Sequence, residues 1–178
     1  MASKMAATLS FPVSERDHVQ GSPDAAVTLV EYGDYECPHC GRAHAIVKQV
    51  QKVAGDHLRF VFRHFPLAQM HPHAERAAEA AEAAGAHGRF WQMHDLLYEN
   101  QQTLDDTHLL LFAEAIDLDT ERFARELRDE IYRERVREDF MSGVRSGVNG
   151  TPTFFINDVR HDGPWDIDSL LYAIEQAV

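Results

Sequence analysis

The sequence predicts an α/β protein in which a central mixed sheet is flanked by helices and interrupted by an inserted all-helical subdomain. Three observations lead to this fold class. A β-α-β pattern occupies residues 27–65, a helical pattern runs from about His71 to Gly147, and two strands followed by a helix occupy residues 151–178. A short edge strand is expected at residues 17–21, so the predicted order is β, β-α-β, a helical insert and β-β-α.

The β-α-β pattern begins with the apolar, β-branched run Val27–Tyr32, which suits a buried central strand. A helix is predicted from Cys37 to Ala54, because apolar residues recur there at the i, i+3, i+4 and i+7 positions of one helical face. Leu58–Phe65 is the next strand. This order predicts a parallel pair of strands joined by a right-handed crossover.

The inserted segment is predicted to contain five helices. An alanine-rich stretch at 74–86 and an aromatic-rich stretch at 90–98 give the first two. Residues 105–107 can cap the third helix, residues 119–120 can cap a short fourth, and a long fifth follows. Charges of both signs crowd residues 119–139, and their helical spacing predicts a solvated face with salt bridges.

The C-terminal part of the chain is predicted to return to the sheet. Thr151–Asn157 is a strand that begins at a proline, and Asn157-Asp158 form a turn into Val159–His161. This pattern predicts an antiparallel hairpin. Asp166 can cap a last helix that runs to the C-terminus.

The composition is that of an ordinary soluble domain. The chain has 178 residues, 44% of them apolar, and a formal net charge of −12. This acidic balance disfavours nucleic acid and anionic membranes as partners, because both need a basic surface. No stretch approaches the roughly 20 consecutive apolar residues of a membrane span. No signal peptide is evident, so the chain as written is expected in the cytoplasm; a removed signal would place it in the periplasm or outside the cell.

The two cysteines of the chain, Cys37 and Cys40, form a CPHC motif at the start of the predicted helix. In a reducing compartment this spacing indicates redox chemistry or metal binding. Pro38 fits the first turn of a helix, where its missing N–H would have had no partner. The positive end of the helix dipole and the unpaired N–H groups favour a thiolate at Cys37 and lower the pKa of this thiol.

The two thiols are therefore expected to have different roles. Cys37 forms a mixed disulfide with the substrate, and the more enclosed Cys40 resolves it. His39 can add a donor or a positive charge that favours the thiolate, whereas like-charge repulsion from Glu36 opposes it. The expected centre is a redox-active Cys37–Cys40 disulfide that needs no cofactor and no metal.

Glu31 is a carboxylate within an apolar strand, six residues before Cys37. If it lies beneath the motif, it can shuttle the proton of Cys40 during resolution. The alternatives are that Glu31 points outward or pairs with Arg63 on the neighbouring strand. The sequence leaves these open.

Four features in this order resemble the DsbA-like branch of the thioredoxin superfamily: CPHC, the carboxylate six residues before it, the FRHFPL strand, and GTPTFFI late in the chain. The resemblance covers nearly everything from Asp17 to the C-terminus. It implies a thioredoxin fold and a protein thiol:disulfide oxidoreductase. In the family the proline that matches Pro152 is cis, and the segment around it pairs with an extended substrate. The resemblance thus implies that Thr151 and Pro152 face the substrate.

This comparison also sets the expected domains. Residues 17–68 and 148–178 would form the thioredoxin-like domain, 69–147 the helical subdomain and 1–16 a flexible lead-in. The Pro-His dipeptide favours oxidation of substrates. Threonine at position 151 is common among isomerase and reductase relatives, so the direction of exchange stays open.

Other functions remain as alternatives. A zinc site would use Cys37, Cys40 and His44, but the sequence has no second paired knuckle. A peptide-binding holdase or adaptor could use the groove near Pro152, and a glutathione-linked transferase could use the same scaffold. The expected partners are protein substrates and a redox-recycling partner, and the protein is expected to be a monomer.

Overall fold

The structure is a computed structural model that describes residues 6–178. It divides into two compact units. Among the described residues, the first unit consists of residues 6–33 together with Arg42–Arg63 and Met141–Val178. The second consists of Asp34–Gly41 and His64–Phe140, so the CPHC motif belongs to the unit that holds most of the helices. The domain boundaries expected from the sequence stay a prediction.

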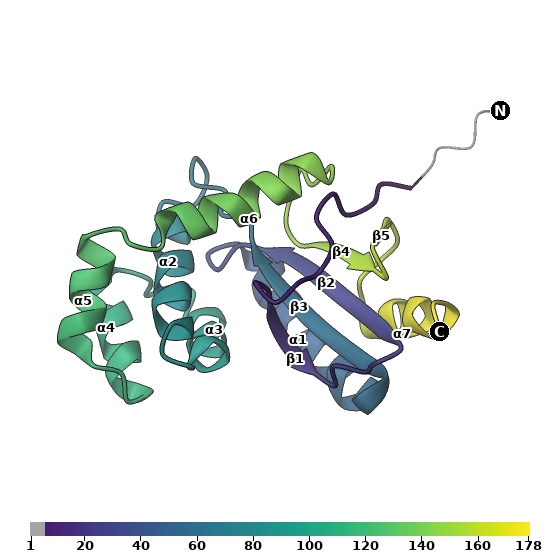
Figure 1. Cartoon of the computed structure of the whole chain (residues 1–178), viewed down its shortest axis with the longest axis horizontal. Coiled ribbons are helices and arrows are strands. Elements are labelled where there is room, and N and C mark those ends of the chain that lie inside the picture. Colours follow the sequence, from purple (N-terminus) through teal and green to yellow (C-terminus); the bar gives the residue numbers. More distant parts are fainter. Residues whose placement is uncertain (1–5) are drawn as a thin grey trace. The chain divides into compact units, whose positions relative to one another are not determined.

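The first unit contains a five-stranded mixed sheet with the strand order β1-β3-β2-β4-β5 (Figure 1). The pairs β1–β3, β2–β4 and β4–β5 are antiparallel. The bounds are β1 His18–Gly21, β2 Val27–Gly33, β3 Leu58–His64, β4 Thr153–Ile156 and β5 Val159–His161. Both central strands are almost entirely buried, as the apolar runs predict.

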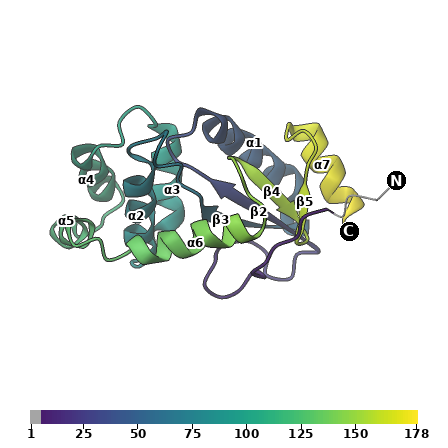
Figure 2. The same ribbon diagram turned by 90° about the horizontal axis from the view of Figure 1, so that it is seen from above.

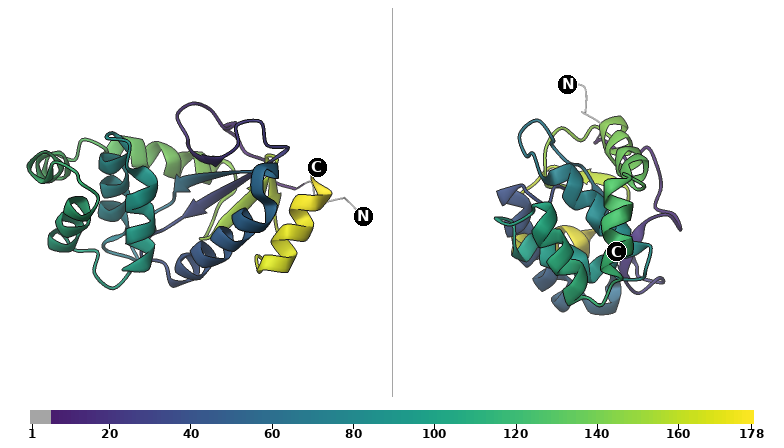
Figure 3. Two further views of the ribbon diagram at one scale, coloured as in Figure 1. Left: turned by 90° about the horizontal axis from the view of Figure 1, so that it is seen from below. Right: turned by 90° about the vertical axis from the view of Figure 1, so that its left-hand side faces the viewer.

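Two helices pack in the first unit, α7 (Ile167–Gln176) and α1 (Pro38–Ala54) from Arg42 onward. They lie side by side on one face of the sheet (Figure 3). The predicted cap of the last helix is confirmed, because the side chain of Asp166 accepts a hydrogen bond from the Ser169 N–H at 3.0 Å. The largest fully buried side chains of the strands are Leu29, Tyr32, Phe60, Phe62, Phe154 and Phe155.

The described part of the expected lead-in is hydrogen-bonded to the edge of the sheet. The Leu9 N–H donates to the carbonyl of Asp158 at 2.9 Å, and the Arg160 N–H donates to the carbonyl of Ala7 at 2.8 Å. Leu9 is itself buried. Residues 1–5 of the lead-in lie outside the described residues, and the flexibility of the segment stays a prediction.

Most of the second unit is built from α2 to α5 and from α6 up to Phe140; α2 to α6 lie between β3 and β4 in the chain (Figure 2). The expected five helices are α2 Ala74–Gly85, α3 Phe90–Glu99, α4 Asp106–Ala115, α5 Thr120–Arg128 and α6 Arg133–Arg145. Asp105 and Asp119 cap α4 and α5 through their side chains, as predicted. The small alanine side chains of α2 let α3 and α5 pack closely against it.

The predicted solvated face at residues 119–139 is wrong for two of its carboxylates. Glu126 and Asp139 are buried. Each is held by an arginine four residues away on its own helix, Arg122 for Glu126 and Arg135 for Asp139. The helical spacing of opposite charges is right, but the packing of the helices buries the two carboxylates. No helix among residues 6–178 has the length and apolar character needed to cross a membrane.

Glu79 on α2 is a buried carboxyl group, only 5% exposed. Burial raises its pKa to about 7; Arg76 opposes this shift, and the carboxylates of Glu130 and Glu75 add to it. Because the folded-state pKa lies above the unfolded value, folding is penalised once the pH rises past the unfolded pKa, and the full penalty is present above pH 7.

We therefore expect Glu79→Gln to raise the free energy of unfolding by roughly 2 kcal/mol at pH 8 and to change it little at pH 4. For a chain of this size the melting temperature at pH 8 would rise by about 4–8 °C. Thermal unfolding at both pH values checks this. Glu114→Gln, on the exposed surface of α4, is the matched control. An equal shift at both pH values would contradict the assignment.

Candidate active site

The CPHC motif begins at the N-terminus of α1. The carbonyl of Cys37 accepts the first helical hydrogen bond, from the Gly41 N–H at 3.1 Å, so Cys37 occupies the N-cap position and Pro38 the first helical position. The positive end of the helix dipole therefore lies at Cys37, as predicted, and this position favours a thiolate. Cys40 is fully buried and Cys37 is 4% exposed, whereas Pro38 and His39 are exposed. Both cysteines are free thiols here.

Asp34 holds the turn in front of Cys37. Its Oδ1 accepts hydrogen bonds from the N–H groups of Glu36 at 2.8 Å and Cys37 at 3.2 Å. Its Oδ2 accepts from the Leu67 N–H at 2.9 Å and lies 2.8 Å from Nδ1 of His71. One carboxylate thus joins the CPHC turn to the loop after β3. No sequence pattern marks Asp34 as part of the site, because its partners Leu67 and His71 lie more than 30 residues away.

His71 and His73 belong to this site. Burial lowers the pKa of His71, but the hydrogen bond to Asp34 and the charge of Asp34 outweigh this effect. The negative charges of Cys37 and Glu36 add to the rise, so the pKa of His71 lies above its usual value. His73 precedes α2, and its N–H and Nδ1 lie 2.7 and 3.0 Å from the two carboxylate oxygens of Glu36. The Glu36 charge that the sequence sets against the thiolate is therefore shared with a histidine.

Gln101 supports the motif from the start of the loop that follows α3. Its Nε2 donates to the carbonyls of Tyr35 at 2.9 Å and Cys37 at 2.8 Å. A Cβ atom at Gly41 would lie 2.2 Å from Oε1 of Gln101, so the glycine after CPHC leaves room for this side chain. No sequence signal marks Gln101, because a single glutamine in a loop carries no pattern.

Aromatic side chains line the inner side of the CPHC turn. Tyr35 is buried, and its hydroxyl lies 2.9 Å from Nδ1 of His94 on α3. Its ring packs on Tyr98 with the centroids 4.8 Å apart. The predicted apolar face of residues 90–98 therefore supports the turn that presents the thiols, which is more than a general core role.

Glu31 lies in the middle of β2 in the first unit, with Phe154 of β4 as its cross-strand partner. It is 1% exposed, so the alternative that it points to solvent is wrong. Arg63, the other partner considered, forms an ion pair with Asp17 at 2.8 Å and a hydrogen bond to the Tyr32 hydroxyl at 3.0 Å. Glu31 is therefore a buried carboxylate of the sheet, and its proton-shuttling role stays a prediction.

Thr151 and Pro152 precede β4 in the first unit, and both are partly buried. The peptide bond between them is cis, as the resemblance implies. The hydroxyl of Thr153 donates to the carbonyl of Gly150 at 2.7 Å and closes the turn. Their predicted role as the substrate-facing segment stays a prediction, as does the Cys37–Cys40 disulfide.

The family model described as thioredoxin matches residues 13–176. The chain belongs to the thioredoxin family. Within this family the chain is similar, at 26% identity and a TM-score of 0.84, to oxidised BdbD from Bacillus subtilis, with 97% of each chain covered. A thioredoxin-like oxidoreductase from Silicibacter pomeroyi is 30% identical with a TM-score of 0.81, over 92% of this chain and 93% of that one.

These likenesses confirm the α/β thioredoxin fold with a helical insert. Wolbachia pipientis alpha-DsbA1, at 21% identity and a TM-score of 0.80, has the same fold over 95% of this chain and 94% of its own. By family and fold the chain is a thiol-disulfide oxidoreductase of the DsbA-like kind.

Other relatives have a higher sequence identity to the chain, and the matching region is one part of a larger protein. The chain is 47% identical over 170 residues to a protein named Na(+)/H(+) antiporter NhaA 3 from Salinispora tropica. The matched region covers 95% of this chain but only 26% of that protein. A Na(+)/H(+) antiporter NhaA from Herminiimonas arsenicoxydans is 40% identical, with 90% of this chain and 25% of that protein covered. The chain thus spans about a quarter of these relatives, and the cytoplasmic location expected of the chain as written stays a prediction.

Proposed function

We propose that the Cys37–Cys40 pair exchanges disulfides with cysteines of protein substrates. The observation that carries this is the N-cap position of Cys37, whose thiol lies at the helix N-terminus while Cys40 is enclosed in the first turn. This is the arrangement that a reactive and a resolving thiol need. Glu31 is the proposed proton acceptor for Cys40, and the cis Thr151-Pro152 segment is the proposed partner for an extended substrate.

In the oxidising direction, a substrate thiolate attacks Sγ of Cys37 in the disulfide. The Cys37–Cys40 bond breaks, and Cys40 leaves as a thiolate that takes up a proton. A second substrate thiolate then attacks the substrate sulfur of the mixed disulfide, which forms the substrate disulfide and releases Cys37 as a thiolate. Two electrons pass from the substrate to the pair. Reduction or isomerisation of substrates uses the same steps in reverse, and the reduction potential of the pair sets the direction.

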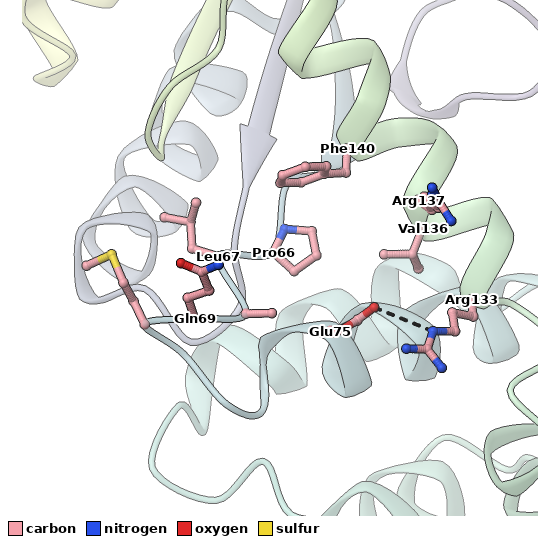
Figure 4. Close-up of a pocket in the computed structure, with 10 residues that line it drawn as sticks. Pro66, Leu67, Gln69, Glu75, Arg133, Val136, Arg137 and Phe140 are labelled. Carbon is pink, nitrogen blue, oxygen red and sulfur yellow. Dashed lines mark ion pairs between the residues drawn. The ribbon is translucent and has the colours of Figure 1, made fainter.

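A groove in the second unit is the observation that favours a protein as the substrate. It has a volume of about 610 Å³, and Figure 4 shows its apolar floor of Pro66, Leu67, Val136 and Phe140. Leu67 is also the residue whose N–H is bonded to Asp34, so the groove starts at the loop that is tied to the turn before Cys37. A groove of this size and polarity can hold apolar side chains of an extended peptide.

The charges at the groove favour an acidic segment. Arg133 and Arg137 are four residues apart on α6 and lie on the same helical face as Val136 and Phe140. Arg133 lies 3.8 Å from Glu75, whereas no side chain among residues 6–178 pairs with Arg137. An exposed guanidinium beside an apolar floor suits a carboxylate next to a bulky apolar side chain.

The test uses oxidised protein and a reduced synthetic peptide with two cysteines and a Leu-Asp pair between them. Wild type should convert the peptide dithiol to a disulfide with a matching gain of two thiols on the protein, measured by mass spectrometry. Arg137→Glu should slow this reaction about 5- to 10-fold and leave oxidation of dithiothreitol unchanged, because only the peptide reaches the groove.

The control is Arg128→Glu, the same charge reversal at an exposed site of α5. It should oxidise both the peptide dithiol and dithiothreitol at the wild-type rate. A peptide with Leu-Lys in place of Leu-Asp should lose most of its sensitivity to Arg137→Glu. Peptide binding without oxidation would favour the holdase alternative instead, and stoichiometric zinc in the reduced protein, lost in Cys37→Ala, would favour a metal site.

A further inference from the structure

We propose that Asp34 and His71 are positioning residues of the redox pair: the buried Asp34 carboxylate fixes the turn before Cys37, and an imidazolium at His71 offsets its charge so that a thiolate can form at Cys37. Neither residue belongs to the CPHC motif. The proposal rests on the dithiol–disulfide exchange proposed above, because it concerns the ionised form of the reactive thiol.

The first step of the argument is the burial of Asp34, whose side chain has no exposed surface. A buried carboxylate is stable only when hydrogen bonds and a counter-charge replace its hydration. Asp34 has both, because its two oxygens accept three backbone N–H groups and lie beside one imidazole. The donors come from the CPHC turn on one oxygen and from the loop after β3 on the other. The carboxylate therefore fixes the backbone in front of the reactive thiol.

The second step concerns charge. A carboxylate whose oxygen accepts the Cys37 N–H opposes a second negative charge on the same residue. The ionisable groups that face His71 are Asp34, Glu36 and Cys37, which are all acidic. The short contact of Nδ1 with Oδ2, together with these charges, keeps His71 protonated more readily than a free histidine. When His71 is charged, the Asp34–His71 ion pair has a net charge close to zero. The N-terminus of α1 can then stabilise the thiolate of Cys37.

The third step separates His71 from the other histidines of the site. His39 lies in the motif but is exposed, so water screens its charge. His73 is bonded to Glu36 and is 48% exposed at its side chain. His71 is 16% exposed and is bonded to the carboxylate that holds Cys37. Of these three histidines, His71 is therefore the one whose charge acts with the least screening on the reactive thiol.

A linkage follows from this geometry. In the reduced protein a Cys37 thiolate adds a negative charge beside His71, and the disulfide removes it. His71 should therefore bind its proton more tightly in the reduced protein than in the oxidised one, and by the same coupling the protonated His71 favours the thiolate.

The test is the pH profile of Cys37 alkylation by iodoacetamide, read at Cys37 by mass spectrometry, in wild type and His71→Gln. Removal of the imidazolium leaves the Asp34 charge uncompensated, so the midpoint of the profile should rise by about one pH unit and the rate at pH 6 should fall about 10-fold. The rate at pH 10 should stay within about twofold. A His71→Gln profile that superimposes on the wild-type profile would overturn the proposal.

His108→Gln is the matched control, because His108 forms the same Nδ1–carboxylate contact, at 2.6 Å to Asp105, on α4. Its profile should match that of wild type. If His71→Gln does not fold, the wild-type protein still decides: the imidazole of His71, followed by NMR, should titrate at a higher pH in the reduced than in the oxidised protein, and equal midpoints would refute the coupling. Failure of wild type to exchange with glutathione, with the alkylation shift intact, would refute the proposed function alone.

Discussion

Cys37→Ser is expected to lower the rate of disulfide exchange by roughly 10³-fold or more, because a hydroxyl at this position is neither a thiolate nor able to form a disulfide. Cys37 caps α1, and serine is a good residue at a helix N-cap, so the variant should fold. The measurement is the oxidation of reduced peptide under single-turnover conditions. Residual exchange within about tenfold of wild type would mean that Cys40 can attack directly.

Cys40→Ser is the companion variant. Cys40 is fully buried in the first turn of α1, so it should act only after Cys37 has formed a mixed disulfide. We expect this variant to accumulate mixed disulfides at Cys37 with substrate proteins, visible as adducts on non-reducing gels and lost in the Cys37→Ser/Cys40→Ser double variant. Adducts on Cys37→Ser instead would reverse the roles of the two thiols.

Glu31→Gln is expected to slow the resolving step by about 10²-fold, if the buried carboxylate accepts the proton of Cys40. Glu31 is 1% exposed on β2, and glutamine keeps its size. The measurement starts from a mixed disulfide of Cys37 with glutathione and follows the release of glutathione. Alkylation of Cys37 should stay within about threefold of wild type, since Glu31 is proposed to act on the other thiol.

Glu79→Gln is the control for this experiment, because it neutralises another buried carboxyl group, on α2. It should release glutathione at the wild-type rate. Equal rates in Glu31→Gln and wild type would leave Glu31 as a structural residue of the sheet.

The sequence by itself determined the local part of the site. The N-cap position of Cys37, the first-turn position of Pro38 and the caps Asp105 and Asp119 follow from residue types within one helical turn. The order of strands and helices follows in the same way from the spacing of apolar residues. Such signals are readable because the interacting groups lie three or four positions apart.

Only the tertiary structure decided which distant residues complete the site. Asp34 meets Leu67 and His71 across more than 30 residues, and Gln101 meets Cys37 across more than 60. Single aspartates, histidines and glutamines in loops carry no periodicity, so no local pattern could assign them. The same reason explains Glu31, whose burial depends on how the sheet is covered. The physical cause is that a buried carboxylate takes its partners from whichever segments the fold brings within hydrogen-bond distance.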